Sequence, residues 1–217
     1  MKVCVTAMDC EAETVIRNLS AVREERLFGR RVVFGSIGGE ETAVVIAGVG
    51  KSNAAAGTQL AAGSLAADVI INVGVAGGLD PNLSVGAVYR ASKAVEYDFD
   101  LSKVNGTSVG TPNECDTPFF ELAAAGDWPV AVVATGDRFT DDENDFDFLR
   151  STFGASVRDM ELGAVAHAAF HAGIPVFSFK AITNVVGQGA MTAQYRENLP
   201  RCLDVLAREV PSFYAAI

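Results

Sequence analysis

The stretch DVIINVGVAGGL, residues 68–79, decides the fold of this chain. Its first half, Val69 to Val73, is short, mostly apolar and rich in β-branched residues, which is typical of a buried strand. The glycines of Gly74 to Gly78 predict a turn directly after this strand. A second glycine-rich turn, Gly48 to Gly50, follows another buried run. Because ligands of open α/β sheets gather at strand ends, we expect both turns to border a binding site.

Outward from this stretch, short β-branched runs alternate with alanine-rich helical stretches. This alternation predicts an α/β fold in which helices cover both faces of a central sheet. The other strands are expected at residues 2–7, 31–37, 42–47, 87–97, 130–135 and 176–184. The helices are expected at residues 11–19, 52–66, 117–124, 144–152, 161–172 and 193–207.

The composition is that of one globular domain spanning residues 1–217, because 217 residues that are 49% hydrophobic suffice for a single large core and no linker divides them. No apolar run is long enough to cross a bilayer, and the first residues resemble a strand rather than a signal peptide, so we expect a cytoplasmic protein. The 4 scattered cysteines predict no disulfide. The formal net charge of -10 argues against nucleic acids and membranes as partners and favours a small neutral or cationic ligand.

Three local motifs suggest other chemistry but lack the residues that would complete it. Gly50-Lys51-Ser52 lacks the upstream glycine of a phosphate-binding loop, since Val45 stands at that position. His167 and His171 lie one turn apart on an expected helix, but the sequence shows no third ligand, so we interpret both as helix-surface residues and expect no metal. The acidic run from Asp141 to Asp147 lacks the pattern of a calcium loop.

Two glutamates stand at the starts of expected helices. Glu11 follows the strand-like run that leads to Met8, and Glu161 opens the helix at 161–172. The free amides and the dipole of a helix N-terminus favour a carboxylate. By itself Glu11 is a capping acid, and Glu161 is a cap or a hydroxyl-binding carboxylate, so neither residue decides the function.

Several short motifs together resemble the nucleoside phosphorylase superfamily, specifically its hydrolytic branch, the 5'-methylthioadenosine/S-adenosylhomocysteine nucleosidases. The motifs are AMDCE at 7–11, GVGK at 48–51, DVIINVGVAGGL at 68–79, YDFD at 97–100, TGDRF at 135–139, DME at 159–161 and KAITN at 180–184. Their common order across nearly the whole chain is more specific than any one of them. The resemblance implies a three-layer αβα fold with a mixed, twisted central sheet, an N-glycosyl hydrolase without cofactor, and a homodimer.

The resemblance also implies roles for individual residues. Glu11 would activate the attacking water, Glu161 would accept hydrogen bonds from the ribose hydroxyls, and Asn184 stands where the N7 proton of the purine is handled. The other substrate-binding positions are Met8, Val49, Val75, Ala76, Phe139, Thr140, Met160, Lys180 and Thr183. Val104 and Pro112 fall where the second protomer of a dimer covers the 5' end of the substrate.

The chemistry of N-glycosidic cleavage requires such residues. Positive charge develops on the sugar and negative charge on the leaving base, and the enzyme must stabilise both. Glu11 and Glu161 suit the sugar. Phosphorolytic relatives bind phosphate through arginines and a serine near the glycine-rich turns, and the stretch at 74–78 contains neither. We therefore expect water as the nucleophile, with a phosphorylase as the rival.

Asn184 departs from the relatives that act on adenine nucleosides, which carry aspartate there. Adenine that leaves with a protonated N7 presents two donors and suits a carboxylate, whereas asparagine offers one donor and one acceptor and complements a 6-oxopurine. Lys180, where arginine is usual, and Thr183, where serine is usual, are milder changes. The substrate stays open between a methylthioadenosine or adenosylhomocysteine type and a 6-oxopurine nucleoside of the futalosine or inosine type. A non-catalytic purine nucleoside binder is a further alternative.

Overall fold

Strand β5 (Val69–Gly78) lies at the centre of the computed structural model, which describes all 217 residues. It pairs in parallel with β1 (Lys2–Thr6) and with β10 (Val176–Val185). β1 in turn pairs in parallel with β4 (Glu40–Ile46). A strand with parallel neighbours on both sides is covered by helices on both faces, which is why its sequence is an almost unbroken apolar run.

Antiparallel strands flank this parallel centre, so the sheet is mixed. β2 (Ser20–Leu27) and β3 (Arg30–Ile37) extend it beyond β4 as an antiparallel ribbon. On the other side, β6 (Val88–Glu96) pairs antiparallel with β10, and β8 (Val130–Thr135) pairs in parallel with β6. β9 (Val157–Asp159) joins β8 to β5, so this half of the sheet closes on itself.

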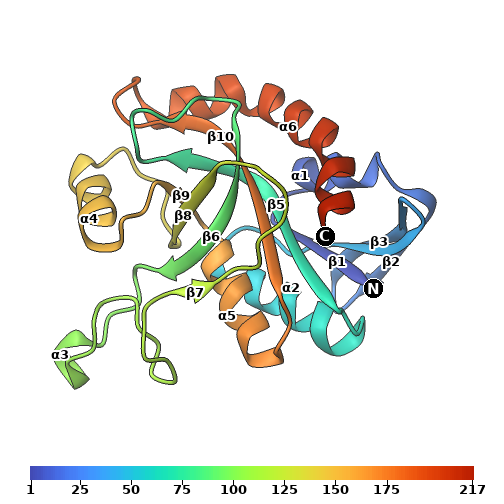
Figure 1. Cartoon of the computed structure of the whole chain (residues 1–217), viewed down its shortest axis with the longest axis horizontal. Coiled ribbons are helices and arrows are strands. Elements are labelled where there is room, and N and C mark those ends of the chain that lie inside the picture. Colours follow the sequence, from blue (N-terminus) through green and yellow to red (C-terminus); the bar gives the residue numbers. More distant parts are fainter.

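Helices cover both faces of the sheet (Figure 1). α1 (Asp9–Ile16) and α6 (Met191–Ala216) pack together on one face. α2 (Lys51–Ser64) and α5 (Leu162–Ala172) pack together on the other face. The predicted three-layer αβα fold with a mixed central sheet is thus confirmed.

Two further helices lie outside these layers. α4 (Glu143–Phe153) packs at the end of the sheet beside β8, and the short α3 (Ser102–Asn105) projects from the body of the molecule (Figure 1).

Alternate residues of the central strands enter two different cores. Val3 and Val5 of β1 pack in the core shared with α2 and α5, whereas Cys4 between them packs in the core shared with α1 and α6. Neighbouring residues Ile70 and Ile71 of β5 divide in the same way. This period-two alternation follows from the pleat of a strand, which turns successive side chains to opposite faces.

Two predicted elements are wrong. Gly74 to Gly78 form no turn but continue β5, because Gly77 and Gly78 still pair with β9 and β10. Residues 117–124 form no helix; they run extended and contain the short strand β7 (Phe120–Glu121), which pairs with β6. Phe120 is buried and stacks on His167 of α5, and this tertiary contact overrides the helical pattern of the segment.

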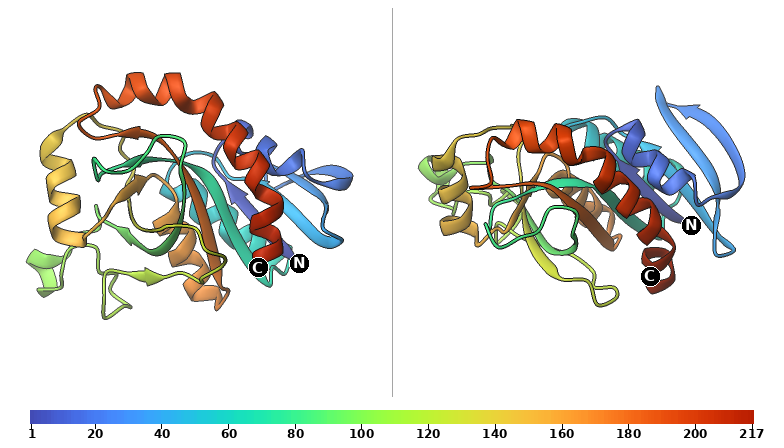
Figure 2. Two further views of the ribbon diagram at one scale, coloured as in Figure 1. Left: turned by 45° about the horizontal axis from the view of Figure 1, so that its top comes forward. Right: turned by 90° about the horizontal axis from the view of Figure 1, so that it is seen from above.

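The two ends of the chain lie side by side (Figure 2). The ammonium group of Lys2 donates a hydrogen bond of 3.1 Å to the backbone carbonyl of Tyr214. α6 is longer than the predicted helix at 193–207 and continues past Pro200 and Pro211. None of the helices has both the length and the apolar character that a membrane span requires.

Candidate active site

One pocket lies where β1, β5, β9 and β10 end, and it gathers nearly all the residues that the sequence analysis assigned to substrate binding. The predicted residues that line it are Met8, Glu11, Val49, Val75, Ala76, Phe139, Thr140, Met160, Glu161, Thr183 and Asn184. The other lining residues, which the sequence analysis did not assign, are Ala7, Gly77, Arg138, Arg158, Asp159, Met191 and Tyr195. Lys180 is the one predicted substrate-binding residue of this chain's own pocket that does not line it.

The carboxylate of Glu11 is held by three backbone N–H groups. Its Oε2 accepts from Ala7 (3.2 Å) and Met8 (3.1 Å), and its Oε1 accepts from Val75 (2.9 Å) on β5. Only 4% of the residue is exposed, and this burial raises the pKa of Glu11, against the lowering effects of Lys180 and of the three donors. The result is a fixed, dehydrated carboxylate, which is the setting of a general base.

Strand β5 has to carry glycine beside Glu11. A Cβ atom on Gly74 would lie 2.5 Å from Oε1 of Glu11, closer than any side chain permits. Gly74, which was predicted to form part of a turn, therefore allows the Glu11 carboxylate to lie close to the backbone of β5.

Glu161 precedes the first turn of α5 and also faces the pocket. Its Oε1 accepts a hydrogen bond of 2.9 Å from the backbone N–H of Gly50, in the second glycine-rich segment. Burial, together with the nearby charge of Asp159, raises the pKa of Glu161 to about 7. A carboxylate with so few partners is suited to accept hydrogen bonds from the hydroxyl groups of a ligand.

Lys180 and Asp159 form a buried ion pair next to the pocket. The ammonium group of Lys180 lies 2.8 Å from Oδ2 of Asp159, and both residues are almost fully buried. Asp159 also accepts hydrogen bonds from Thr135 Oγ1 (2.5 Å) and from the backbone N–H of Leu162 (3.0 Å) at the start of α5. Lys180 is thus placed to position Asp159 and the start of α5 rather than to touch a ligand.

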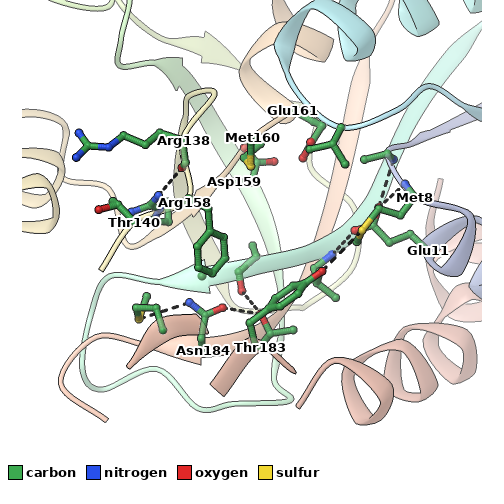
Figure 3. A pocket seen from close by; sticks show the side chains of 18 residues that line it. Met8, Glu11, Arg138, Thr140, Arg158, Asp159, Met160, Glu161, Thr183 and Asn184 are labelled. Carbon is green, nitrogen blue, oxygen red and sulfur yellow. Dashed lines mark hydrogen bonds between the residues drawn. The ribbon is translucent and has the colours of Figure 1, made fainter. Parts of the chain in front are cut away.

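Asn184 lies on β10 at the other end of the pocket from Glu11 (Figure 3). Its Oδ1 accepts a hydrogen bond of 2.7 Å from the hydroxyl group of Thr183. Its Nδ2 has only the sulfur of Met191, at 3.5 Å, as a partner. Because a thioether is a weak acceptor, this amide N–H remains available to a ligand oxygen.

Among the lining residues that the sequence analysis did not assign, Arg158 carries a buried guanidinium group. β9 and β10 flank β5 so that Arg158 and Asn184 both stand opposite Gly77, and a Cβ atom on Gly77 would lie 3.0 Å from Asn184 Nδ2 and 3.3 Å from Arg158 Cγ. Nη2 of Arg158 donates to the carbonyl of Arg138 (2.5 Å), but Nη1 is buried and has no partner. Buried donors in proteins are normally paired, so the unpaired N–H of this guanidinium is available to an acceptor. No signal in the sequence indicated that the three-residue strand β9 would bring Arg158 to the pocket.

Aromatic side chains close one side of the pocket. Phe139 and Tyr195 of α6 meet edge to face with ring centroids 5.7 Å apart. The hydroxyl group of Tyr195 lies 3.7 Å from the sulfur of Met8. Phe139 is 48% exposed, so its ring presents a free face that a planar base can cover.

Val104 and Pro112, the two residues expected to reach a second protomer, do not line this pocket. Val104 of α3 is 82% exposed. Pro112 is buried within its own chain. Of these two residues, only Val104 presents an exposed side chain.

The fold and the pocket together define an α/β protein of the nucleoside phosphorylase type, with its ligand site at the strand ends. The chain belongs to the phosphorylase superfamily, whose family model matches residues 2–213.

Known proteins with similar sequences and structures agree with this assignment. The chain is 28% identical over 197 residues to a 5'-methylthioadenosine/S-adenosylhomocysteine nucleosidase from Marinomonas sp. (strain MWYL1), and the match covers 85% of each chain. The solved structure of such a nucleosidase from S. pneumoniae, with a transition-state inhibitor, superposes with a TM-score of 0.90 at 24% identity, over 100% of this chain and 99% of that chain. Futalosine hydrolase of Helicobacter pylori strain 26695 superposes with a TM-score of 0.91 at 22% identity, over 100% and 97%. These matches confirm the predicted fold, the resemblance to the nucleosidases and the enzyme class of N-glycosyl hydrolase.

Proposed function

We propose that this chain hydrolyses the N-glycosidic bond of a purine nucleoside. The observation that carries the proposal is the setting of Glu11, a buried carboxylate fixed by three backbone donors at one end of the pocket. Figure 3 shows Glu11 and Met8 at one end and Thr140 and Arg158 at the other, with Glu161 across from Asn184. A sugar fits between the two glutamates and a purine fits toward Asn184.

In the proposed reaction, water attacks C1' of the sugar while Glu11 accepts a proton from it. The bond between C1' and the base breaks, its electron pair passes to the base, and the base takes up a proton from solvent at N7. Glu11 then returns the proton that it accepted to solvent. Glu161 accepts hydrogen bonds from the ribose hydroxyls and opposes the positive charge that develops on the sugar. Phe139 covers one face of the purine, which holds the base in place as the bond breaks.

The first candidate substrate is a nucleoside of the 5'-methylthioadenosine or S-adenosylhomocysteine type. Its support is the likeness over most of the chain to nucleosidases that bear these names. The apolar Met8 and Met160 in the pocket lining suit a sugar that carries a thioether substituent.

The second candidate is a 6-oxopurine nucleoside of the futalosine or inosine type, and two side chains favour it. The free amide N–H of Asn184 and the unpaired Nη1 of Arg158 are both donors, and both residues line the pocket from strands on either side of Gly77. A carbonyl oxygen at position 6 of the base accepts from such donors, whereas the amino group of adenine does not. The solved structure of a futalosine hydrolase has the same fold.

We also propose that the active form is a homodimer. The exposed Val104 on the projecting helix α3 is the residue of this chain that would reach the 5' end of a substrate in the other protomer. Substitution of Val104 by aspartate would then raise KM more than it lowers kcat, because it changes binding and leaves Glu11 in place.

A base-release assay tests the proposal and separates the candidates. Methylthioadenosine, S-adenosylhomocysteine, inosine, guanosine and futalosine are each supplied with and without phosphate, and free base is measured over hours. We expect base release that does not depend on phosphate. Formation of ribose 1-phosphate only when phosphate is present would make the chain a phosphorylase. Tight binding of a nucleoside without base release would make it a binding protein.

Glu11→Gln tests the assigned base. The amide keeps the size of the side chain but cannot accept a proton, so we expect turnover to fall by about 100-fold to 10,000-fold with the fold intact. Glu13→Gln, on the same helix but outside the pocket lining, is the matched control. Equal turnover of Glu11→Gln and wild type would remove Glu11 from its role.

Asn184→Asp tests the identity of the base. A carboxylate accepts from both the protonated N7 and the amino group of adenine, so we expect kcat/KM on adenine nucleosides to rise by roughly tenfold to a hundredfold. Thr183, whose hydroxyl group already donates to this side chain, supports the new carboxylate. A variant that gains nothing on methylthioadenosine would contradict the hydrogen-bond argument.

A further inference from the structure

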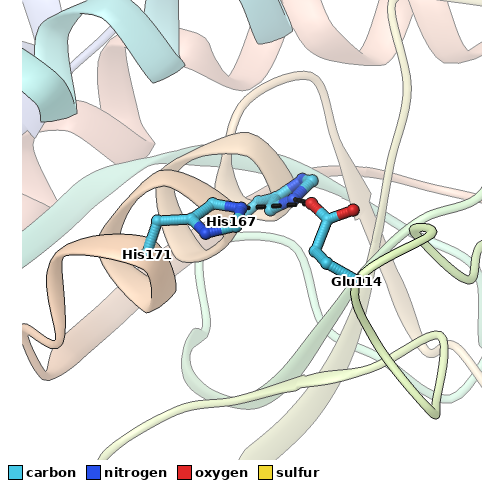
Figure 4. A group of neighbouring side chains, drawn as sticks. All are labelled: Glu114, His167 and His171. Carbon is cyan, nitrogen blue, oxygen red and sulfur yellow. Dashed lines mark hydrogen bonds and ion pairs between the residues drawn. The ribbon is translucent and has the colours of Figure 1, made fainter.

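A cluster of two histidines and one glutamate lies outside the active-site pocket (Figure 4). His167 and His171 stand one turn apart on α5, and Glu114 comes from the segment between α3 and β7. Oε1 of Glu114 lies 2.9 Å from Nε2 of His167 and 3.1 Å from Nε2 of His171. The tertiary structure thus supplies the third ligand that the sequence did not show.

The ring of His167 faces carboxylates on both sides. Its Nδ1 lies 2.8 Å from Oε2 of the buried Glu96, while its Nε2 faces Glu114. A neutral imidazole carries one N–H and can satisfy only one of these two carboxylates. When that N–H is donated to Glu96, the lone pair of Nε2 faces the oxygen of Glu114, and the two repel unless a cation lies between them.

From this geometry we propose that His167, His171 and Glu114 bind a divalent transition-metal ion of the zinc type. Zinc lies about 2.0–2.1 Å from nitrogen and oxygen ligands, so two of its ligand atoms in a tetrahedral site are about 3.3 Å apart. The observed 2.9 Å and 3.1 Å are within a few tenths of an ångström of that separation, and all three ligand atoms lie within 4.8 Å of one another. Imidazole nitrogens favour zinc, copper and nickel over magnesium and calcium.

The surroundings of His167 fit this role as well. Glu96 accepts the N–H of Nδ1, which leaves Nε2 unprotonated and fixes the ring, as the outer carboxylate does in carboxylate–histidine–zinc sites. Phe120 of β7 stacks on the same ring with centroids 4.7 Å apart. The site is therefore oriented on one side by α5, Glu96 and β7, and only Glu114 and the partly exposed His171 have to adjust when the ion binds.

The ion would tie the segment between α3 and β7 to α5. None of its three ligands lines the pocket that holds Glu11, so its role is to hold this segment in place and not to take part in bond cleavage. The inference is thus independent of the proposed hydrolysis.

Zinc binding to the purified full-length protein tests the inference. After treatment with a chelator, the protein is titrated with zinc ions against a chromophoric indicator, and a parallel titration uses magnesium ions. We expect one zinc per chain, no magnesium binding, and an X-ray absorption spectrum with imidazole nitrogen and carboxylate oxygen ligands. Substoichiometric binding, or a spectrum without imidazole ligands, would overturn the inference. The positive charge between the two carboxylates would then come from a second proton on the imidazole ring of His167.

His171→Ala and Glu114→Gln each remove one proposed ligand at an exposed position, so both variants should fold. We expect each to weaken zinc binding by at least about tenfold. Asp116→Asn, an exposed acid of the same segment outside the cluster, is the matched control and should bind zinc as the wild type does. Equal affinity of His171→Ala and wild type would contradict the assignment.

Discussion

Glu11 and Glu161 are two carboxyl groups of one pocket whose surroundings differ. Glu11 accepts from three backbone N–H groups, whereas Glu161 accepts from only one. Burial raises the pKa of both groups, and burial together with the charge of Asp159 raises the pKa of Glu161 to about 7. In the empty pocket the charged form of the Glu161 carboxylate is therefore disfavoured, and a hydrogen bond from a ligand hydroxyl group would stabilise it.

Glu161→Gln tests the raised pKa of Glu161 through the pH dependence of stability. In the unfolded chain Glu161 titrates near its ordinary pKa of 4.5, and in the folded chain near about 7, so its contribution to stability falls as the pH rises between these values. Glutamine does not titrate and keeps an oxygen for the N–H of Gly50. We expect the variant to be more stable than wild type by roughly 1–3 kcal/mol at about pH 8, as measured by urea unfolding.

The difference between Glu161→Gln and wild type should shrink as the pH is lowered through about 4.5, because below this pH both the folded and the unfolded wild type hold the proton. A difference that stays constant across this range would show that the folded pKa of Glu161 is not raised. Base release by the variant, measured on the same samples, should fall, because glutamine does not carry the charge that opposes the sugar cation.

Arg158→Met tests whether the unpaired guanidinium selects the base. Methionine is close in length and apolar, so it fills the buried site without the donor. We expect kcat/KM on inosine or futalosine to fall by roughly tenfold to a hundredfold, and on methylthioadenosine by much less. The ratio of the two kcat/KM values is the measurement, since a general loss of folded enzyme cancels in it. An unchanged ratio would remove Arg158 from base selection.

At the level of elements, helix α2 packs against the sheet at a glycine. A Cβ atom on Gly57 would lie 2.7 Å from Cβ of Ala47 and 3.5 Å from Val5, so the helix and the strand ends are in direct contact there. Glycine lowers helix propensity, and its presence at this buried position reflects the close approach. The approach also sets the position of Gly50, which precedes the first residue of α2. The backbone N–H of Gly50 donates to Glu161.

Gly57→Ala should therefore destabilise the protein by about 1–3 kcal/mol in urea unfolding, because the added methyl group pushes α2 off the sheet. Gly63→Ala on the same helix is the matched control. Gly63 is exposed, and its added Cβ would meet only the flexible side chain of Gln59 at 3.8 Å. That variant should gain about 0.5–1 kcal/mol from helix propensity. Two variants that shift stability in the same direction would contradict the packing argument.

At the level of the whole molecule, β10 joins the two halves of the sheet. It pairs with β5 on one side and with β6 on the other, while β9 completes the closed half. The first strand and the last helix also meet, through Lys2 and Tyr214. Because β5 pairs with both β9 and β10, the two halves of the sheet cannot separate without loss of strand pairing, which supports the proposal that residues 1–217 form one domain.

We therefore expect a single cooperative unfolding transition, with coincident midpoints in far-ultraviolet and near-ultraviolet circular dichroism. If the homodimer is the stable form, the midpoint should also rise with protein concentration. Two separate transitions would contradict the single domain. A midpoint that does not depend on concentration would weaken the case for a stable dimer.

The sequence alone determined the layers of the fold and most of the pocket. Hydrophobic periodicity is local, so the buried strand at Val69 to Val73 and the helices on both faces followed from it. The resemblance to the nucleosidases predicted that Glu11, Glu161 and Asn184 share one site, and in the structure all three line the same pocket. The match of the phosphorylase superfamily model to residues 2–213 agrees with the predicted family.

Only the tertiary structure decided which residues meet across strands and loops. The three-residue strand β9 brings Arg158 to the same pocket as Asn184, Lys180 pairs with Asp159 and does not line the pocket, and Glu114 meets two histidines of α5. Each of these contacts joins segments that are distant in the sequence and depends on pairing register and close backbone approach. A single sequence carries no periodic signal for such contacts, because they are fixed by packing among several elements at once.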